Sequence, residues 1–110
     1  MNHLATSKED ILAASRDLIK ENGWAAVSIR AVASRCSVSA GTIYNYYESK
    51  ADLLSDTIES IWHEIFFHPE DEQIFHDVET CISWIYERLE YGNRQFPGFF
   101  SCLLYTSDAA

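Results

Sequence analysis

The sequence predicts an all-α fold, and two observations carry that prediction. Only four glycines and two prolines interrupt the 110 residues, and apolar residues recur three and four positions apart rather than in alternation. Hydrophobic residues make up 47% of the chain and charged residues 23%, which is ordinary for a globular protein and argues against disorder. Five helices are predicted, of which the second and third are short and the last two are long.

Charge divides the chain into two unlike halves. The formal net charge is −9, which taken whole argues against nucleic acid as a partner, because phosphates repel an acidic surface. Residues 1–50 nevertheless carry a net charge of +1 and residues 51–110 a net charge of −10. Within residues 26–50, Arg30, Arg35 and Lys50 stand against Glu48 alone. The asymmetry predicts two units with different tasks, divided near residue 50.

The first helix is predicted to start at Thr6, because Glu9 three residues later completes a capping-box pattern. Its apolar positions follow helical spacing: Ile11, Ala14, Leu18 and Ile19. Gly23 after Asn22 predicts the end of this helix, since glycine adopts the left-handed conformation without steric cost.

A second helix is predicted from residue 29 to about residue 36, with Ser28 as its N-cap. The positions expected to face inward are Ile29, Val32 and Ala33. Ser37 and Val38 then form a tight turn.

A third short helix is predicted from residue 40 to about residue 46, with Ser39 as its N-cap. Small residues open it, namely Ser39, Ala40, Gly41 and Thr42. Ile43 and Tyr47 lie four apart and are expected to fix it against the second helix. The opposite face carries hydroxyl, phenol and amide groups: Thr42, Tyr44, Asn45 and Tyr46. Two short helices joined by a tight turn form a helix-turn-helix, and such groups suit DNA phosphates and base edges.

The fourth helix is long and is predicted to start after Ser49 as N-cap, with Asp52 in its first turn where a negative charge suits the helix dipole. Lys50 adds a cation at a helix N-terminus, where a phosphate can lie. The wide apolar face consists of Leu54, Ile58, Ile61, Trp62, Ile65 and Phe66. His68-Pro69 is predicted to end this helix.

A fifth helix is predicted from about residue 73 to residue 91, after an acidic connector at residues 70–72 and with Gly92 as its stop. Its apolar stripe consists of Ile74, Val78, Cys81, Ile82, Ile85 and Leu89. Cys81 within that stripe is predicted to be a small buried hydrophobe.

Several function classes find no support in the sequence. No stretch approaches the ~18–20 apolar residues that cross a bilayer, and the N-terminus lacks the apolar segment of a signal peptide, so a cytoplasmic protein is expected. The three cysteines are too widely spaced for a CxxC metal site. Exposed or hydrogen-bonded histidines are expected rather than metal ligands: His63, His68 and His76. No catalytic triad, carboxylate pair or phosphate-binding glycine loop stands out, so neither an enzyme nor a cofactor is expected.

The segment 23–54, GWAAVSIRAVASRCSVSAGTIYNYYESKADLL, resembles the N-terminal DNA-binding domain of TetR/AcrR-type bacterial transcriptional regulators. The matching positions include Gly23, Ser28-Ile29, Val32-Ala33 and, between residues 38 and 53, the run Gly41-Thr42-Ile43-Tyr44. The resemblance implies a three-helix helix-turn-helix domain over residues 1–50. It also implies the first helices of an incomplete ligand-binding and dimerisation domain over residues 51–101.

The resemblance implies which residues contact DNA. Positions that contact the phosphate backbone are Ser28, Tyr44, Tyr46 and Lys50. Positions at or near the bases are Arg30, Ser39, Ala40, Thr42 and Asn45, and Gly41 is also counted among the DNA-binding residues. Alternatively, Arg30 pairs with Glu48 or lies along the surface, and Thr42 and Asn45 form a solvated face. The alternative for Tyr44 and Tyr46 is a hydrophobic seam between helices.

Two residues depart from the family's pattern. Ser37 stands where the family usually has glycine, so the turn is strained if this residue needs a positive φ. Ala40 stands where many relatives carry a longer polar residue, which leaves a methyl group able to meet a thymine methyl.

The aromatic residues of the last two helices allow two interpretations. They form core between the helices, or some of them line a pocket for a small lipophilic ligand; the candidates for pocket lining are Trp62, Phe66 and Trp84. In the resembled family the second domain binds an inducer and dimerises. The resemblance therefore implies a homodimeric repressor that binds a palindromic operator in double-stranded DNA and responds to an unknown small-molecule effector.

A second hypothesis is a helical protein–protein interaction module with the acidic half as its docking surface. Residues 102–110 match the translation of a transposase-type sequencing adapter. We expect those residues to be a non-native tail without function, and the natural sequence to end near Ser101.

Overall fold

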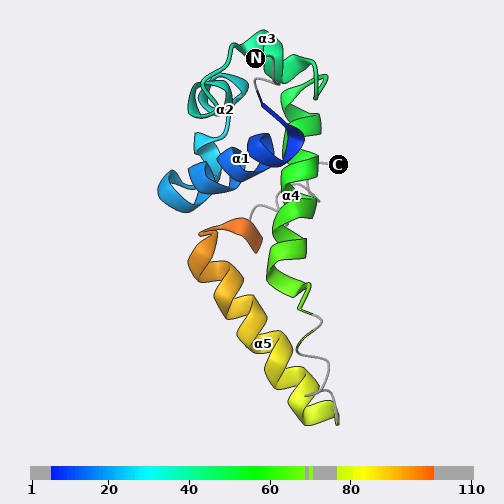
Figure 1. Cartoon of the computed structure of the whole chain (residues 1–110). Helices are drawn as coiled ribbons and strands as arrows, with labels where there is room; N and C mark the ends of the chain where they lie inside the picture. Colours follow the sequence, from blue (N-terminus) through cyan, green and yellow to red (C-terminus); the bar gives the residue numbers. More distant parts are fainter. Residues whose placement is uncertain (1–5, 69, 71–76, 101–110) are drawn as a thin grey trace.

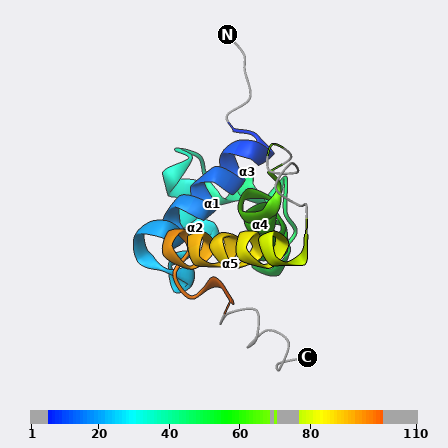
Figure 2. The same cartoon turned by 90° about the horizontal axis from the view of Figure 1, so that it is seen from below.

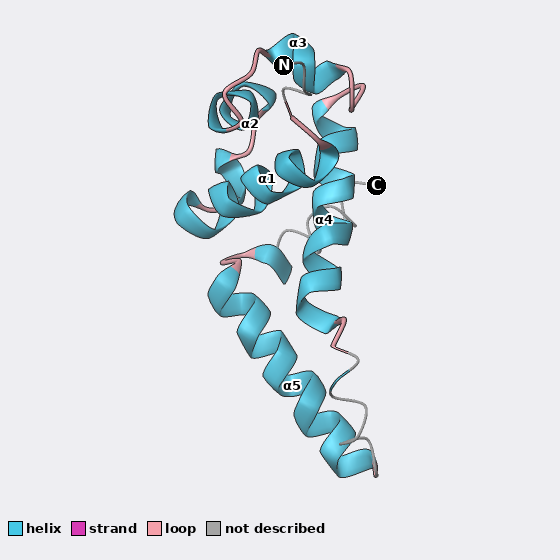
Figure 3. Cartoon of the chain, viewed as in Figure 1, coloured by secondary structure: helices cyan, strands magenta, loops and turns pink. Residues whose placement is uncertain are grey.

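The computed structural model describes residues 6–68, 70 and 77–100. The helices within those ranges are α1 (Lys8–Asn22), the 3-10 helix η1 (Trp24–Ala26), α2 (Ile29–Arg35), α3 (Ala40–Tyr44), α4 (Lys50–Phe66) and α5 (Val78–Gln95). The described part of the chain contains no strand (Figure 3), so the all-α prediction is confirmed there. No helix in it is long and apolar enough to cross a membrane.

The first three α-helices form a bundle at one end of the molecule, and α4 extends away from it (Figure 1). α4 packs against α1, and α3 packs against α2. α5 runs back toward the bundle at an angle to α4, and the view from below shows it lying under the bundle (Figure 2). The end of α5 meets the bundle, where Lys20 Nζ lies 5.1 Å from the centroid of the Phe96 ring.

One apolar core joins the bundle to α4 and to the segment that follows α5. Its buried members are Ile11, Ala14, Leu18, Ile19, Val27, Ile29, Val32, Ala33, Ile43, Tyr47, Leu53, Ile61, Ile65, Phe96 and Phe99. The predicted inward faces of the first two helices are therefore confirmed. Burial of this surface is the main favourable term that holds the short helices together, because helices of five or seven residues are not stable alone.

The start of α1 was predicted one residue too early. Ser7 is the N-cap, and its hydroxyl oxygen accepts a hydrogen bond of 3.2 Å from the backbone N–H of Asp10. Thr6 is buried instead. Serine and threonine are both good N-caps, so packing rather than local preference chose between them. The predicted end is confirmed, since Gly23 has a φ of +91° and its N–H bonds to the Ile19 carbonyl.

The bounds of α5 correct the prediction at both ends. Asp77 and Thr80 form a capping box, so the helix begins at Val78 rather than at residue 73; Ile74, His76 and most of the acidic connector lie outside the described residues. Gly92 does not stop the helix. It is buried, and a Cβ atom there would lie 2.6 Å from Ile65 Cδ1. The glycine permits close approach of α5 to α4.

The apolar faces of the two long helices also differ from the predictions. α4 buries Leu53, Thr57, Ile61 and Ile65, so the predicted face is confirmed at Ile61 and Ile65. Its other members are half-buried or exposed, because α1 covers only part of a wide apolar surface: Leu54, Ile58, Trp62 and Phe66. The α5 stripe is mostly exposed: Val78, Ile82, Ile85 and Leu89. Cys81 is half-buried rather than buried. The start of α5 extends beyond the end of α4 (Figure 1).

Candidate nucleic-acid interface

Three serines set the starts of the helices around the turn. Each hydroxyl oxygen accepts a hydrogen bond from the backbone N–H three residues later, at 3.0 Å for Ser28, 3.3 Å for Ser39 and 3.2 Å for Ser49. The three predicted N-caps are therefore confirmed. Such caps satisfy one of the N–H groups that a helix leaves unpaired at its start, and the remaining N–H groups favour anions such as phosphate.

The turn between α2 and α3 is a Schellman motif. The backbone N–H of Val38 donates to the Ala33 carbonyl at 2.9 Å, and that of Ser37 donates to the Ser34 carbonyl at 3.1 Å. Ser37 has a φ of +60°, a left-handed conformation that suits glycine better than serine. The strain expected at this position is therefore present. The motif fixes the angle at which α3 leaves α2.

The inner face of α3 fixes the helix to the core, as predicted. Ile43 is fully buried, and Tyr47 just beyond the helix is 5% exposed. The Tyr47 hydroxyl donates a hydrogen bond of 2.6 Å to the Asp56 carboxylate on α4. Burial, aided by that carboxylate, raises the pKa of Tyr47 well above its usual range. This contact joins the end of the helix-turn-helix to α4.

The outer face of α3 carries small and polar groups. Ser39, Gly41, Tyr44 and Asn45 are exposed, while Ala40 and Thr42 are half-buried. The hydroxyl oxygens of Ser39 and Thr42 lie 3.2 Å apart, so their positions depend on each other. The helix is shorter than predicted, because Asn45 is already its C-cap.

Tyr46 departs from the prediction of an outward side chain. It is half-buried, and its hydroxyl donates a hydrogen bond of 2.8 Å to the Thr6 carbonyl oxygen. That contact spans 40 positions in the sequence, which is why periodicity within α3 could not reveal it. Tyr46 therefore ties α3 to the start of α1, and only its hydroxyl oxygen is left to accept a further hydrogen bond.

Gly41 meets no structural requirement within the described part of the chain. Its φ is not positive, and a Cβ atom there would meet only Ser39 Oγ, at the ordinary contact distance of 3.7 Å. Glycine in a helix costs about 1 kcal/mol relative to alanine. An exposed glycine without an internal reason is consistent with close approach of a partner to the helix backbone.

The cations of this region fall into two groups. Arg35 makes a bidentate ion pair with Glu21, at 2.7 and 2.9 Å. The hydrogen bond from Arg35 lowers the pKa of Glu21, so this pair weakens as the pH falls through the lowered value. Arg30 and Lys50 are exposed and make no ion pair within the described residues. The predicted local excess of positive charge therefore rests on Arg30 and Lys50, and the alternative Arg30–Glu48 pair is not formed.

The three aromatic residues considered for an effector pocket form a connected cluster. Trp62 and Phe66 stack with ring centroids 4.9 Å apart, and Phe66 lies 6.2 Å from Trp84. A shallow apolar groove is lined by Trp62 and Phe66 together with Glu59, His63 and Phe67, but not by Trp84. No group of His, Cys, Asp and Glu side chains suited to a metal occurs among the described residues.

The capped helices, the Schellman turn and the polar outer face define a helix-turn-helix domain of the type found in DNA-binding proteins. Residues 11–57 match the family described as bacterial regulatory proteins, tetR family.

Curated relatives that match this segment are also named as helix-turn-helix transcriptional regulators. The segment is 38% identical over 48 residues to the HTH-type transcriptional regulator UidR of Escherichia coli, covering 44% of this chain and 24% of that protein. It is 45% identical over 47 residues to the HTH-type transcriptional repressor KstR of Rhodococcus jostii, covering 43% and 22% of the two chains. The matches thus span about a quarter of these relatives' length. No solved structure matches the chain at a comparable level of significance.

Proposed function

We propose that this chain is the DNA-binding part of a transcriptional regulator and that α3 is its recognition helix. The observation that carries the proposal is the outer face of α3, which combines an amide, hydroxyls and a glycine without an internal role. An amide can read a base edge, and hydroxyls can contact phosphates. A glycine lets the helix backbone approach the DNA closely.

Each predicted contact residue keeps its assigned role in the proposal. Backbone phosphates are contacted by Ser28, Tyr44, Tyr46 and Lys50. Base edges are approached by Arg30, Ser39, Ala40, Thr42 and Asn45, and Gly41 lets the DNA approach the helix backbone. Tyr46 has the weakest support, because its hydroxyl proton is used by the Thr6 carbonyl. Arg30 and Lys50 have the strongest electrostatic support, because neither charge is neutralised within the described part of the chain.

The regulator acts as a repressor on a palindromic operator, and its acidic half faces away from the DNA. A homodimer would place two recognition helices about 34–36 Å apart on adjacent major grooves. A small-molecule effector would shift the population between two arrangements of the dimer. The name of KstR, a repressor, supports the direction of control. The Trp62–Phe66–Trp84 cluster is the proposed start of an effector site.

Selection from a random duplex library, followed by fluorescence anisotropy, tests this function. We expect the chain to enrich one half-site and to bind it more tightly than a scrambled duplex of the same composition. Affinity should fall steeply between about 50 and 200 mM salt, by about tenfold for every two phosphates that the protein neutralises. If no sequence is enriched and both duplexes bind equally, the proposal is wrong, and the acidic interaction module becomes the better hypothesis.

A further inference from the structure

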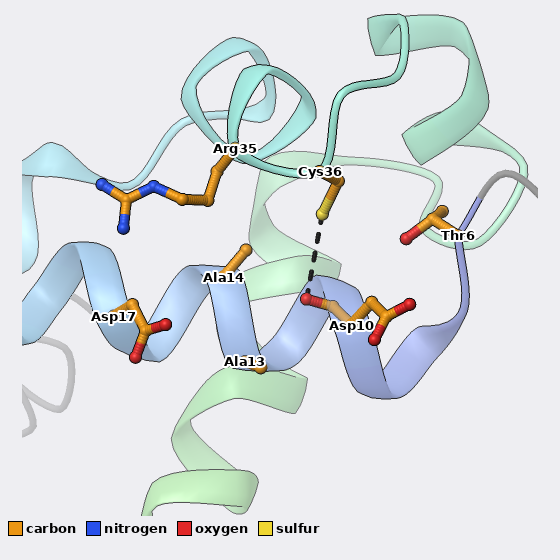
Figure 4. A pocket seen from close by; sticks show the side chains of 7 residues that line it. All are labelled: Thr6, Asp10, Ala13, Ala14, Asp17, Arg35 and Cys36. Atoms are coloured by element: carbon orange, nitrogen blue, oxygen red, sulfur yellow. Dashed lines mark hydrogen bonds between the residues drawn. The ribbon is translucent and has the colours of Figure 1, made fainter.

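A groove of about 320 Å³ lies between α1 and α2 (Figure 4). Two carboxylates of α1, Asp10 and Asp17, lie along it, and α2 contributes Arg35 and the thiol of Cys36. Thr6 closes the end near Asp10. The groove is polar and combines a nucleophilic atom with charged groups.

Thr6 has an unexplained polar group in this groove. Its side chain is 4% exposed, and its hydroxyl oxygen has no hydrogen-bond partner within the described residues. Figure 4 shows this oxygen pointing toward the space between Cys36 and Asp10. Buried hydroxyls almost always have a partner, because an unsatisfied one costs free energy. A ligand group in the groove would supply that partner.

The Cys36 thiol is free and half-buried. Its one hydrogen bond in the described part of the chain is weak, from Sγ to the Asp10 carbonyl oxygen at 3.8 Å. The thiol is therefore held at the wall of the groove rather than sealed in the core. A molecule that enters the groove reaches the sulfur directly.

The charges of the groove select for a cation at the Asp10 end. Asp17 and Glu21 both act on Arg35, which is paired with Glu21, so the Asp17 end already has a cation beside it. The Asp10 carboxylate has no ion pair within the described residues. A negative charge beside the thiol disfavours anionic reagents and concentrates cationic ones.

We propose that this groove is a modification site at which Cys36 forms a mixed disulfide with a small disulfide that carries ammonium groups. The Cys36 thiolate attacks one sulfur of the reagent. A new S–S bond forms to Cys36, the reagent's S–S bond breaks, and the released aminothiolate takes up the proton that Cys36 lost. Cys36 is oxidised and the released half is reduced. The ammonium group left on Cys36 lies between the Asp10 carboxylate and the Thr6 hydroxyl. This inference does not depend on DNA binding.

The test compares two disulfides of similar size on the folded chain at low salt. Cystamine carries two ammonium groups, and bis(2-hydroxyethyl) disulfide is neutral. Peptide mapping by mass spectrometry follows Cys36, with half-buried Cys81 as the internal control thiol. The quantity compared is the rate of reaction of Cys36 with cystamine divided by its rate with the neutral disulfide. We expect this ratio to fall about five- to tenfold in Asp10→Asn, because one nearby negative charge is lost. The ratio should fall less in Thr6→Val, and neither substitution should change it at Cys81.

Asp17→Asn is the matched control, because it removes a carboxylate from the end of the same groove that already holds the Arg35 cation. Its ratio at Cys36 should stay near that of the unchanged chain. Circular dichroism of each variant confirms that the fold is kept. The proposal is overturned if Asp10→Asn leaves the ratio unchanged. It is also overturned if Cys36 reacts in denaturant but with neither reagent in the folded chain.

Discussion

Ser15 on α1 and Thr57 on α4 are both fully buried, and their hydroxyl oxygens lie 3.0 Å apart across the interface of the two helices. Thr57 Oγ1 also lies 2.7 Å from the Leu53 carbonyl oxygen. Each hydroxyl has only one proton to donate. The protons of both Ser15 and Thr57 are therefore needed to link the three oxygens, which are Ser15 Oγ, Thr57 Oγ1 and the Leu53 carbonyl oxygen. This polar contact sets the register of α4 on the bundle, since sliding either helix would leave buried oxygens unpaired.

Thr57→Val should destabilise the chain by about 1–3 kcal/mol, because the nearly isosteric valine leaves the Ser15 hydroxyl buried without a partner. Ser15→Ala combined with Thr57→Val should recover part of that loss, because no buried hydroxyl remains unpaired at this interface. Urea denaturation of the two single variants and the double variant measures this coupling. Strictly additive effects would show that the two hydroxyls act independently.

Ser37→Gly should raise the free energy of unfolding by about 0.5–1 kcal/mol, because glycine relieves the left-handed strain at a φ of +60°. Thermal unfolding should show this as a rise in Tm of a few degrees, roughly 2–8 °C for a domain of this size. Ser34→Gly is the matched control, since Ser34 is an exposed serine inside α2. That variant should be less stable, and a gain in both variants would contradict the assigned strain.

Gly41→Ala should separate stability from DNA binding. The alanine methyl group fits within the chain, so the free energy of unfolding should stay equal or rise by up to about 1 kcal/mol. The same methyl group stands between the α3 backbone and the DNA, so affinity for the selected half-site should fall about tenfold. Ser34→Ala also favours the helix but lies outside the proposed contacts, and its affinity should not change. Unchanged affinity in Gly41→Ala would remove the proposed reason for the glycine.

Asn45→Ala and Lys50→Ala should weaken DNA binding in different ways. Loss of a base-reading amide at Asn45 should cost about 1–3 kcal/mol on the selected half-site and little on a scrambled duplex. Loss of the Lys50 charge should weaken both duplexes alike and reduce the slope of log affinity against log salt by about 1. Anisotropy titrations at several salt concentrations distinguish the two patterns. Identical behaviour of the two variants would contradict the assignment of base and phosphate roles.

Local rules predicted the helix-turn-helix closely because its signals are local. Serine caps at Ser28, Ser39 and Ser49 act within three residues, and the Schellman turn closes within six. The same rules misplaced features that depend on distant partners. Gly92 looked like a helix stop, but its neighbour is Ile65 on another helix. Tyr46 looked outward, but its partner is the Thr6 carbonyl.

The sequence by itself therefore determined the order of the helices, the inner face of the bundle and the match of residues 11–57 to a family of regulatory proteins. Tertiary structure alone decided which polar groups remain free to act. It paired Arg35 with Glu21 and Tyr47 with Asp56, left Arg30 and Lys50 exposed, and buried the Thr6 hydroxyl without a partner among the described residues. The physical reason is the separation in sequence between interacting residues. Caps and turns are fixed by neighbours along the chain, whereas ion pairs and burial depend on segments that meet only when the chain has folded.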